Sequence, residues 1–257
     1  MSGEPVIRVE HLTARYGERT IFEDVSFDVK RGEVFVILGG SGCGKSTLLK
    51  HMIGLYRPAA GHVWIEGEDI SAAEGEARRK LLRRIGVMYQ SGALFGSMTL
   101  LENVRLPLEE YTDLPAEARD LVARTKLRLV QLEGFEDFLP AEISGGMKKR
   151  AAIARAMALD PQLLFLDEPS AGLDPITAAE LDSTILRLAG TLGVTFVVVT
   201  HELASIYAIA DRVIMLDQRK RGILASGTPE ELRDRSGDPF VRAFFRREVV
   251  PEEVRGS

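Results

Sequence analysis

Residues 32–55 read GEVFVILGGSGCGKSTLLKHMIGL, and the fold class is predicted mainly from this segment. Residues 34–38 form a continuous apolar run, which is typical of a strand buried on both faces of a sheet. The residues from Lys45 onward have helical spacing, with a stop signal at Gly54. A buried strand, a glycine-rich loop and a helix in this order predict a phosphate-binding loop at the edge of an α/β sheet.

The loop matches the pattern G-x-x-x-x-G-K-[ST] at every position. Its glycines let the backbone wrap closely around phosphates, Lys45 neutralises β- and γ-phosphate charge, and the Ser46 hydroxyl binds Mg²⁺. A glycine-rich turn that matches by chance is disfavoured by the strand and helix on either side. ATP and Mg²⁺ are therefore the expected ligands. The candidate ATP-binding residues of this segment are Gly39, Gly40, Ser41, Gly42, Cys43, Gly44, Lys45, Ser46 and Thr47.

Composition narrows the class of protein. The chain has 257 residues, a formal net charge of −5 and a hydrophobic fraction of 45%, as expected for a soluble globular protein. The acidic balance disfavours a nucleic-acid binder, so no nucleic-acid partner is expected. The single cysteine, Cys43, indicates a reducing compartment, and we expect it to offer only its backbone N–H to the loop. No apolar run approaches the roughly 18–20 residues that span a bilayer, and no signal peptide is recognised.

Hydrophobic patterning predicts one α/β core that is interrupted by helices. Antiparallel strands near the N-terminus are predicted from three segments, VIRVEHLTARYG, FEDVSFDVKRG and HVWIEGEDI. QLLFLD and TFVVVTH, separated by the helical ITAAELDSTILRLAGTL, predict a parallel sheet with helical crossovers. We expect a single domain over residues 1–257, with its core at about 1–90 and 160–227, a helical subdomain at about 91–159 and a tail at about 228–257.

Two helices of this scheme have specific signals. PAEARDLVARTKLRLVQL places Leu121, Val122, Leu127 and Val130 near one apolar face. In the tail, SGTPEELRDR predicts a helix that Thr228 caps.

Acidic residues follow the second buried strand. QLLFLDEP delivers Asp167 and Glu168 to the carboxyl edge of the sheet, where ligands bind in open α/β folds. Asp167 is the candidate Mg²⁺-binding acid, and Glu168 is the candidate base that orients or deprotonates the attacking water. Without the phosphate loop, a pair of surface acids would be the preferred interpretation.

Two further polar residues are candidates because they converge on the same edge, and one aromatic residue is a separate candidate for contact with the base. His201 follows the strand TFVVVT and is a candidate γ-phosphate sensor, although a lone histidine there is more often structural. Gln90 follows IGVMY and could bind Mg²⁺ or hold the attacking water. Tyr16 either stacks on the base or is an exposed strand aromatic.

A second candidate phosphate cradle lies in the helical insertion, at ISGGMKKRAAIARAMAL from residue 143. Ser144 is a good helix cap, and Gly145 and Gly146 leave backbone N–H groups approachable by an anion. One ATP has one γ-phosphate, which the first loop already binds. A second copy of the chain, related by C₂ symmetry in a head-to-tail homodimer, is the simplest way to bring this cradle to the nucleotide.

These motifs, with SAGLDP, resemble the ATP-binding cassette (ABC) family in order and spacing over nearly the whole chain. The resemblance implies an α/β fold with a RecA-like P-loop core, an antiparallel β-subdomain and an inserted α-helical signature subdomain. It implies two ATPs sandwiched between each P-loop and the partner's signature motif. By similarity, Tyr16 stacks on adenine, Glu168 is the catalytic base, His201 is the switch histidine, and Asp174 communicates across the dimer.

A narrower resemblance is to the ATPases of MCE-type (Mla-like) lipid transporters. Met147 stands where most transport cassettes have Gln, and SGGMKKRAAIARA, YQSGALFGSMTLLENVRLPL and GLDPITA are similar to that group. The resemblance implies phospholipid transport in a bacterial envelope and a peripheral position on the cytoplasmic side of the inner membrane. The implied partners are an integral membrane permease, an MCE-domain substrate-binding protein and a small regulatory subunit.

Several alternatives stay open at this stage. Leu94, Phe95 and Met98 either anchor a permease helix or pack inside the helical subdomain. Val241, Phe244 and Phe245 either grip a neighbouring subunit or pack on their own domain. The cassette could instead drive another importer, for example of polar amino acids, act as a soluble ABC ATPase without transport, or bind nucleotide without catalysis.

Overall fold

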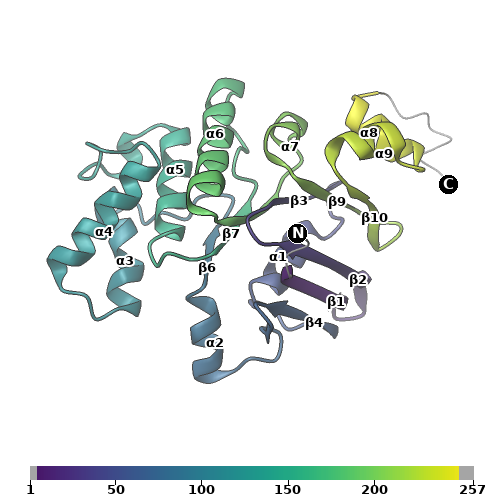
Figure 1. Ribbon diagram of the computed structural model, residues 1–257, viewed down its shortest axis with the longest axis horizontal. Coiled ribbons are helices and arrows are strands. Elements are labelled where there is room, and N and C mark those ends of the chain that lie inside the picture. The colour runs from purple at the N-terminus through teal and green to yellow at the C-terminus, as the bar shows by residue number, and fades with distance from the viewer. Residues whose placement is uncertain (1–4, 249–257) are drawn as a thin grey trace.

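The computed structural model describes residues 5–248, which form two β-sheets and a set of covering helices (Figure 1). The predicted α/β fold with an N-terminal antiparallel sheet and a helical insertion is confirmed. Within residues 5–248, no helix combines the length and the apolar character that crossing a bilayer requires.

The smaller sheet is antiparallel and has the strand order β2-β1-β4-β5. Its strands are β1 (Pro5–Tyr16), β2 (Arg19–Lys30), β4 (Ala60–Ile65) and β5 (Glu68–Asp69). Apolar residues of β1, β2 and β4 pack together with α1 (Lys45–Met52) and one face of the larger sheet. This packing places the end of β1 beside the phosphate loop.

The larger sheet has the order β10-β9-β3-β8-β7-β6. Its strands are β3 (Val34–Gly39), β6 (Ile85–Met88), β7 (Leu163–Asp167), β8 (Thr195–Val199), β9 (Arg212–Asp217) and β10 (Gly222–Gly227). Strands β6, β7, β8, β3 and β9 run parallel, and β10 pairs antiparallel with β9. The carboxyl ends of β3, β8 and β7 therefore meet at one edge.

Both faces of the larger sheet are buried, which explains its continuous apolar runs. In β3, Val34, Val36 and Leu38 face a core cluster shared with the helices, whereas Phe35 and Ile37 face the antiparallel sheet. A strand covered on both sides needs apolar residues at every position, as the sequence predicts.

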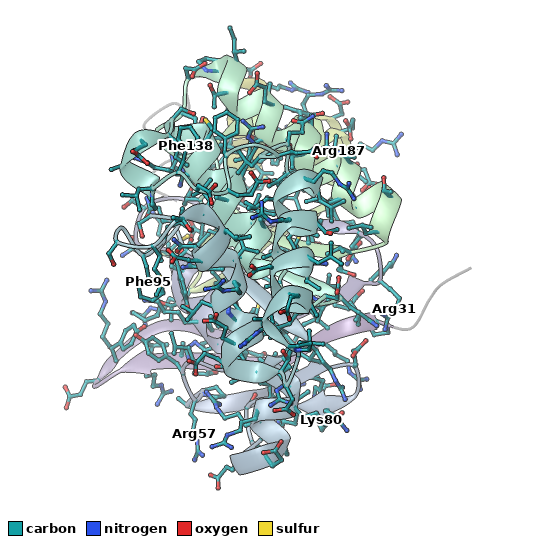
Figure 2. The ribbon with its side chains drawn as sticks, turned by 90° about the vertical axis from the view of Figure 1, so that its left-hand side faces the viewer. Arg31, Arg57, Lys80, Phe95, Phe138 and Arg187 are labelled. Carbon is teal, nitrogen blue, oxygen red and sulfur yellow. The ribbon has the colours of Figure 1, made fainter. Side chains whose placement is uncertain are left out.

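The helical insertion lies between β6 and β7. Residues 89–162, all of them described, form helices and loops only: α3 (Leu100–Tyr111), α4 (Ala116–Leu129), the short 3₁₀ helix η1 (Pro140–Glu142) and α5 (Gly145–Ala156). They lie together at one end of the molecule in Figure 1, and their side chains cover the face seen in Figure 2. The other helices are α2 (Gly75–Leu82), α6 (Pro175–Leu192), α7 (Leu203–Ile209), α8 (Pro229–Arg235) and α9 (Pro239–Arg246).

The buried face of α4 differs from the prediction. Leu127 and Val130 are buried as expected, but Leu121 is 67% exposed. The helix buries Lys126 as well, and the Lys126 ammonium pairs with Asp160 while the rest of its side chain is buried. A long cationic side chain can bury its methylenes in this way, which apolar periodicity does not reveal.

The described part of the predicted tail, residues 228–248, packs on its own chain, and the rest of that prediction lies outside the described residues. Thr228 caps α8 as predicted, and Glu231 completes a capping box with it. Val241 and Phe245 of α9 are buried in the main core, and the Tyr207 hydroxyl donates to the Phe245 carbonyl at 2.9 Å. Phe244 is partly buried against the same core. For these aromatic and aliphatic residues, the own-domain alternative is the one observed.

Candidate functional site

The phosphate loop needs its glycines at specific places. Gly39 has φ +152°, and a Cβ there would lie 2.4 Å from the Leu216 carbonyl oxygen of β9. Gly44 has φ +102°, and a Cβ would lie 2.8 Å from Ile21 Cγ2 of β2. Any side chain at these positions would clash and would also be strained. The loop is thus held between both sheets, with its backbone free to curve around an anion.

Two side chains of the loop have different environments. The Lys45 ammonium donates to the carbonyls of Gly39 and Gly40 at 2.8 and 3.1 Å, so it lies over the loop. Cys43 is buried beneath the loop, and burial raises the pKa of its thiol. A buried, protonated thiol is a poor nucleophile, which fits the expectation that Cys43 contributes only its backbone N–H.

Two candidate Mg²⁺ ligands meet below the loop. Ser46, in the first turn of α1, has its hydroxyl 3.4 Å from Oδ1 of Asp167, which ends β7. The pKa of Asp167 is raised above its ordinary value, by burial and by the neighbouring Glu168. The Ser46 hydroxyl, Lys50 and Lys45 offset part of this shift. Hydroxyl and carboxylate oxygens are the hard donors that Mg²⁺ prefers, so this donor set fits that ion.

Glu168 and His201 form a hydrogen-bonded pair. Oε1 of Glu168 lies 2.8 Å from Nδ1 of His201, which follows β8. Oε2 is buried and has no hydrogen-bond partner among the described residues. Glu168 also has φ +48°, an uncommon backbone conformation for a residue other than glycine. One carboxylate oxygen is therefore held by the histidine and the other remains available to a ligand or water.

Gln90 lies two residues beyond the end of β6, and its side chain is exposed. Its main-chain carbonyl accepts a hydrogen bond from the ammonium of Lys149 on α5, and that ammonium lies 3.4 Å from the Glu168 carbonyl. Sequence reasoning missed Lys149, which reads only as one of several cations on this helix. Its distance of 59 residues from Gln90 leaves no local signal.

Tyr16 ends β1 at the margin of the site and is 48% exposed. Its hydroxyl lies 3.4 Å from Thr47 Oγ1, and its ring meets the ring of Tyr56 edge-on at 6.1 Å. An exposed aromatic ring that is also held by an edge-on contact with a second ring is suited to stacking on a base. The structure thus places Tyr16 and Thr47 together.

The second cradle is formed at the start of α5, which Ser144 caps by accepting from the Met147 N–H at 3.2 Å. Gly145 is exposed, but Gly146 is buried, and a Cβ on it would lie 2.2 Å from Thr177 Cγ2 of α6. Asp174 caps α6 and accepts from the Thr177 hydroxyl at 2.5 Å, a bond that lowers the pKa of Asp174. Close packing against Thr177 of the same chain therefore favours glycine at position 146, which the sequence pattern did not predict.

The two cradles belong to different parts of the molecule. Helix α5 packs against α3, α4, α6 and β6, and the phosphate loop follows β3. Strands β8 and β7 separate β3 from β6, so these strands are about 14 Å apart at three spacings of about 4.8 Å. The structure joins Ser46, Asp167, Glu168 and His201 by direct contacts, and it joins the Ser144–Gly146 turn to the Asp174 cap separately.

A glycine loop at the carboxyl edge of a parallel sheet, with acids and a histidine at neighbouring strand ends, defines a P-loop nucleotide-binding protein. The chain belongs to the ABC transporter family, whose profile matches residues 22–171.

Known relatives extend this assignment over nearly the whole chain. It is 43% identical over 247 residues to the probable ribonucleotide transport ATP-binding protein mkl of Mycobacterium leprae, covering 95% of this chain and 70% of that protein. It is 39% identical over 243 residues to the intermembrane phospholipid transport system ATP-binding protein MlaF of Haemophilus influenzae, covering 95% of this chain and 91% of that protein.

A solved structure extends the comparison to three dimensions. The chain matches a dimeric ATP-binding cassette in a post-hydrolysis state bound to ADP and Pi with a TM-score of 0.77 and 30% identity, covering 86% of this chain and 98% of that chain. The chain is therefore an ATP-hydrolysing ABC subunit with a RecA-like core.

Proposed function

We propose that the chain drives phospholipid transport in a bacterial envelope, as the ATP-hydrolysing subunit of an MCE-type complex. The pairing of Glu168 with His201, beside Asp167 and Ser46, carries the catalytic part of this proposal. The similarity to MlaF supports the cargo. The subunit would lie on the cytoplasmic side of the inner membrane, bound to a permease, with an MCE-domain protein and a small regulatory subunit completing the complex.

In this proposal the phosphate loop and Lys45 bind the triphosphate, and Tyr16 stacks on adenine. Ser46, Asp167 and Gln90 would hold Mg²⁺, which neutralises phosphate charge when it is bound. The Ser46 and Asp167 oxygens are already 3.4 Å apart, which is close enough for both to bind one ion.

Glu168 would act as the general base. Its Oε1 is oriented by His201 at 2.8 Å, and its Oε2 is buried and lacks a partner within residues 5–248. A buried carboxylate oxygen without a partner is suited to accept a hydrogen bond from a water molecule and to take its proton. The side chain of His201 is more than half exposed, and in this proposal it would contact the γ-phosphate.

Two copies would share each nucleotide. The turn at Ser144–Gly146 presents backbone N–H groups at a helix N-terminus, on a part of the molecule remote from its own phosphate loop. A head-to-tail homodimer brings the turn of one copy to the γ-phosphate bound by the other, with Asp174 near the seam. ATP can move the membrane partner only through its higher affinity for this closed dimer.

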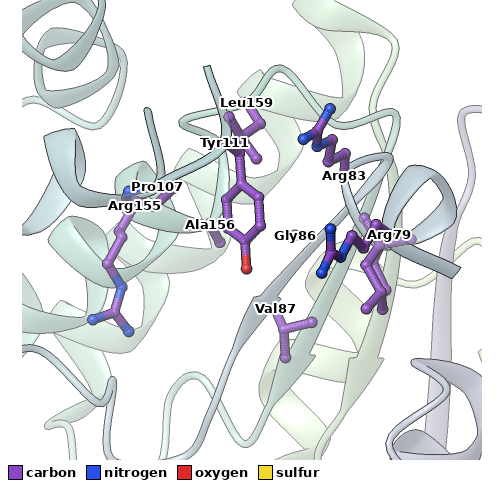
Figure 3. A pocket seen from close by; sticks show the side chains of 11 residues that line it. Arg79, Arg83, Gly86, Val87, Pro107, Tyr111, Arg155, Ala156 and Leu159 are labelled. Carbon is purple, nitrogen blue, oxygen red and sulfur yellow. The ribbon is translucent and has the colours of Figure 1, made fainter. Parts of the chain in front are cut away.

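The permease would dock beside the helical subdomain. A cavity of about 440 Å³ lies among α2, β6, α3 and the end of α5, and it is lined by Leu82, Tyr111, Arg79, Arg83 and Arg155 among others. Figure 3 shows Tyr111 with Arg79 and Arg83 on one side and Arg155 on the other. An apolar helix that carries an acidic side chain fits this combination of apolar wall and positive charge.

Phe95 continues this surface and is the best exposed of the three predicted anchors. It is 50% exposed, and its ring centroid lies 5.9 Å from the Arg155 guanidinium. Figure 2 shows it on the same face as Lys80 of α2. Leu94 packs partly against its own core, and Met98 is half-buried. We therefore assign permease contact to Phe95 and the adjoining cavity.

The catalytic proposal is tested with Glu168→Gln. This variant keeps the size of the side chain but cannot accept a proton from water, so it should bind ATP, stop turnover and remain as a dimer. Size-exclusion chromatography with ATP and Mg²⁺ measures the dimer, and phosphate release measures turnover. A variant that stays monomeric at saturating ATP counts against the shared site.

The cargo is tested by purifying the chain with its membrane partner. Phospholipid should copurify with the assembled complex, and Phe95→Asp should release the membrane partner while the isolated subunit still binds ATP. Recovery of a ribonucleotide or a polar amino acid in place of lipid would refute the proposed cargo and leave the ATPase assignment intact.

A further inference from the structure

Lys149 is a buried cation at the centre of the ATPase machinery. It lies on the signature helix α5 and is 8% exposed. Its ammonium donates to the Gln90 carbonyl and lies 3.4 Å from the Glu168 carbonyl. The side chain thus connects three segments that are far apart in the sequence: the signature helix, the loop after β6 and the loop after β7.

Burial makes this arrangement costly for an ammonium group. Removal from water lowers the pKa of Lys149 below its ordinary value. The nearby carboxylates of Glu168 and Asp167 offset part of this effect. A buried charge is retained when it is hydrogen-bonded and compensated by neighbouring charge. Two main-chain carbonyls and two acids supply that compensation, so the position of Lys149 depends on both loops being in place.

Both carbonyls belong to residues just beyond the ends of strands, at 90 after β6 and at 168 after β7. Gln90 lies beyond β6, outside the strand ladder. Glu168 has φ +48°, and such a conformation persists only when its surroundings fix it. Its N–H donates to the Val199 carbonyl at 2.8 Å, and its carbonyl accepts from the Ala171 N–H at 3.3 Å. The ammonium of Lys149 adds a hold on this carbonyl from the helical subdomain.

A second buried lysine of the same subdomain shows the contrast. Lys126 on α4 is 6% exposed, and its ammonium pairs with the carboxylate of Asp160, which is itself exposed. That pair joins α4 to the turn after α5 and touches none of the nucleotide-binding motifs. Lys126 therefore serves as a matched control for the general cost of removing a buried lysine.

We propose that Lys149 is a positioning residue that ties the placement of Gln90 and of the proposed catalytic base Glu168 to the signature helix. When α5 moves with the helical subdomain, the ammonium carries the loop after β6 and the strained Glu168 backbone with it. Turnover then depends on the position of the signature helix even though Lys149 does not touch the nucleotide. This inference rests on the proposed role of Glu168 as the base.

The test compares Lys149→Met, Lys149→Arg and the control Lys126→Met. Methionine replaces the four lysine methylenes with an unbranched apolar chain of the same number of heavy atoms and lacks the ammonium donor. We therefore expect Lys149→Met to lower kcat about tenfold or more while KM for ATP changes by less than about twofold. Arginine keeps the charge and the donors and should restore kcat to within about threefold of the parent. Lys126→Met should leave kcat unchanged.

Amide hydrogen exchange of the nucleotide-free chain gives a second readout that needs no turnover. Lys149→Met should speed exchange in residues 89–93 and 168–171, whereas Lys126→Met should not. If Lys149→Met does not fold, Lys149→Gln, which keeps an N–H donor without the charge, is used with the same expected direction.

The proposal is overturned if exchange in both segments is unchanged, if KM rises in proportion to the loss of kcat, or if Lys126→Met loses as much activity as Lys149→Met. A parent protein without turnover would instead remove the proposed role of Glu168, and the exchange comparison would still decide whether Lys149 positions the two loops.

Discussion

Replacing Gly146 with alanine tests the packing of the signature turn. The added Cβ would lie 2.2 Å from Thr177 Cγ2, well inside the roughly 3.5–4.0 Å at which carbon atoms pack. Thr177 cannot turn away freely, because its hydroxyl is hydrogen-bonded to Asp174 at 2.5 Å. Helices α5 and α6 must therefore separate locally, or the bond to Asp174 must break.

The expected cost follows from this overlap. Overpacking of a well-packed contact costs about 1–3 kcal/mol, and part of the roughly 1 kcal/mol preference of helices for alanine over glycine offsets it. We expect Gly146→Ala to lower the free energy of unfolding by about 1–2 kcal/mol. For a chain of this size that corresponds to a melting temperature lower by about 2–8 °C.

Urea unfolding of Gly146→Ala, Thr177→Ser and the double variant measures the interaction. Thr177→Ser removes the clashing methyl group, keeps the hydroxyl for Asp174 and costs about 0.8 kcal/mol by itself. In the Thr177→Ser background, Gly146→Ala should leave the free energy of unfolding unchanged or raise it. Any ATP hydrolysis that Gly146→Ala alone loses through instability should then be regained in the double variant. The control Gly145→Ala, at an exposed position 3.4 Å from Leu173 Cδ2, should change stability by less than about 0.5 kcal/mol.

The packing argument fails if Gly146→Ala is as stable as the parent, or if its cost is the same with serine at position 177. A double variant that is fully stable but inactive would show instead that the bare glycine is needed at the nucleotide.

Two further predictions concern buried polar groups. Asn103→Ala should lower the free energy of unfolding, measured in urea, by about 2–3 kcal/mol. The fully buried side-chain amide of Asn103 donates to three carbonyls of the loop at 95–99 and accepts from the Phe95 N–H at 2.8 Å, and alanine removes all of these bonds. A loss below about 1 kcal/mol would contradict this account. Burial lowers the pKa of His51, so the folded chain binds fewer protons there than the unfolded chain does, and stability falls as the pH drops below the ordinary histidine value of about 6.5. Urea unfolding at pH 7.5 and 5.5 should therefore show a larger loss for the parent than for His51→Gln, and equal losses would refute it.

The phosphate loop and the parallel sheet were predictable because their signals are local. In β3 every residue must be apolar when both faces are covered, and the glycine pattern follows within the next few positions. The acids and His201 follow from the same rule, because the carboxyl ends of parallel strands share an edge. The direct contact of Glu168 with His201 adds geometry that the sequence could only suggest by convergence.

The remaining features depend on contacts between distant segments. Leu121 lies on the exposed side of α4, whereas Lys126, paired with Asp160, is among the residues that the helix buries. The packing of Gly146 depends on Thr177, and the role of Lys149 depends on Gln90, so neither can be derived from the signature segment alone. The hairpin of β9 and β10 also escaped prediction, since β10 is only half-buried and has a weak apolar pattern.

The contact of Gly146 with Thr177 has a consequence for how two copies would work as a pair. The turn that the proposed dimer would present to the partner's nucleotide packs on the same helix start that Asp174 caps. A displacement of the start of α6 would also shift the Ser144–Gly146 turn that one protomer presents to the other. The turn and the part of the dimer interface near Asp174 would therefore move together. Neither nucleotide site of the dimer could then change its geometry independently, and ATP hydrolysis at one site would be coupled to hydrolysis at the other.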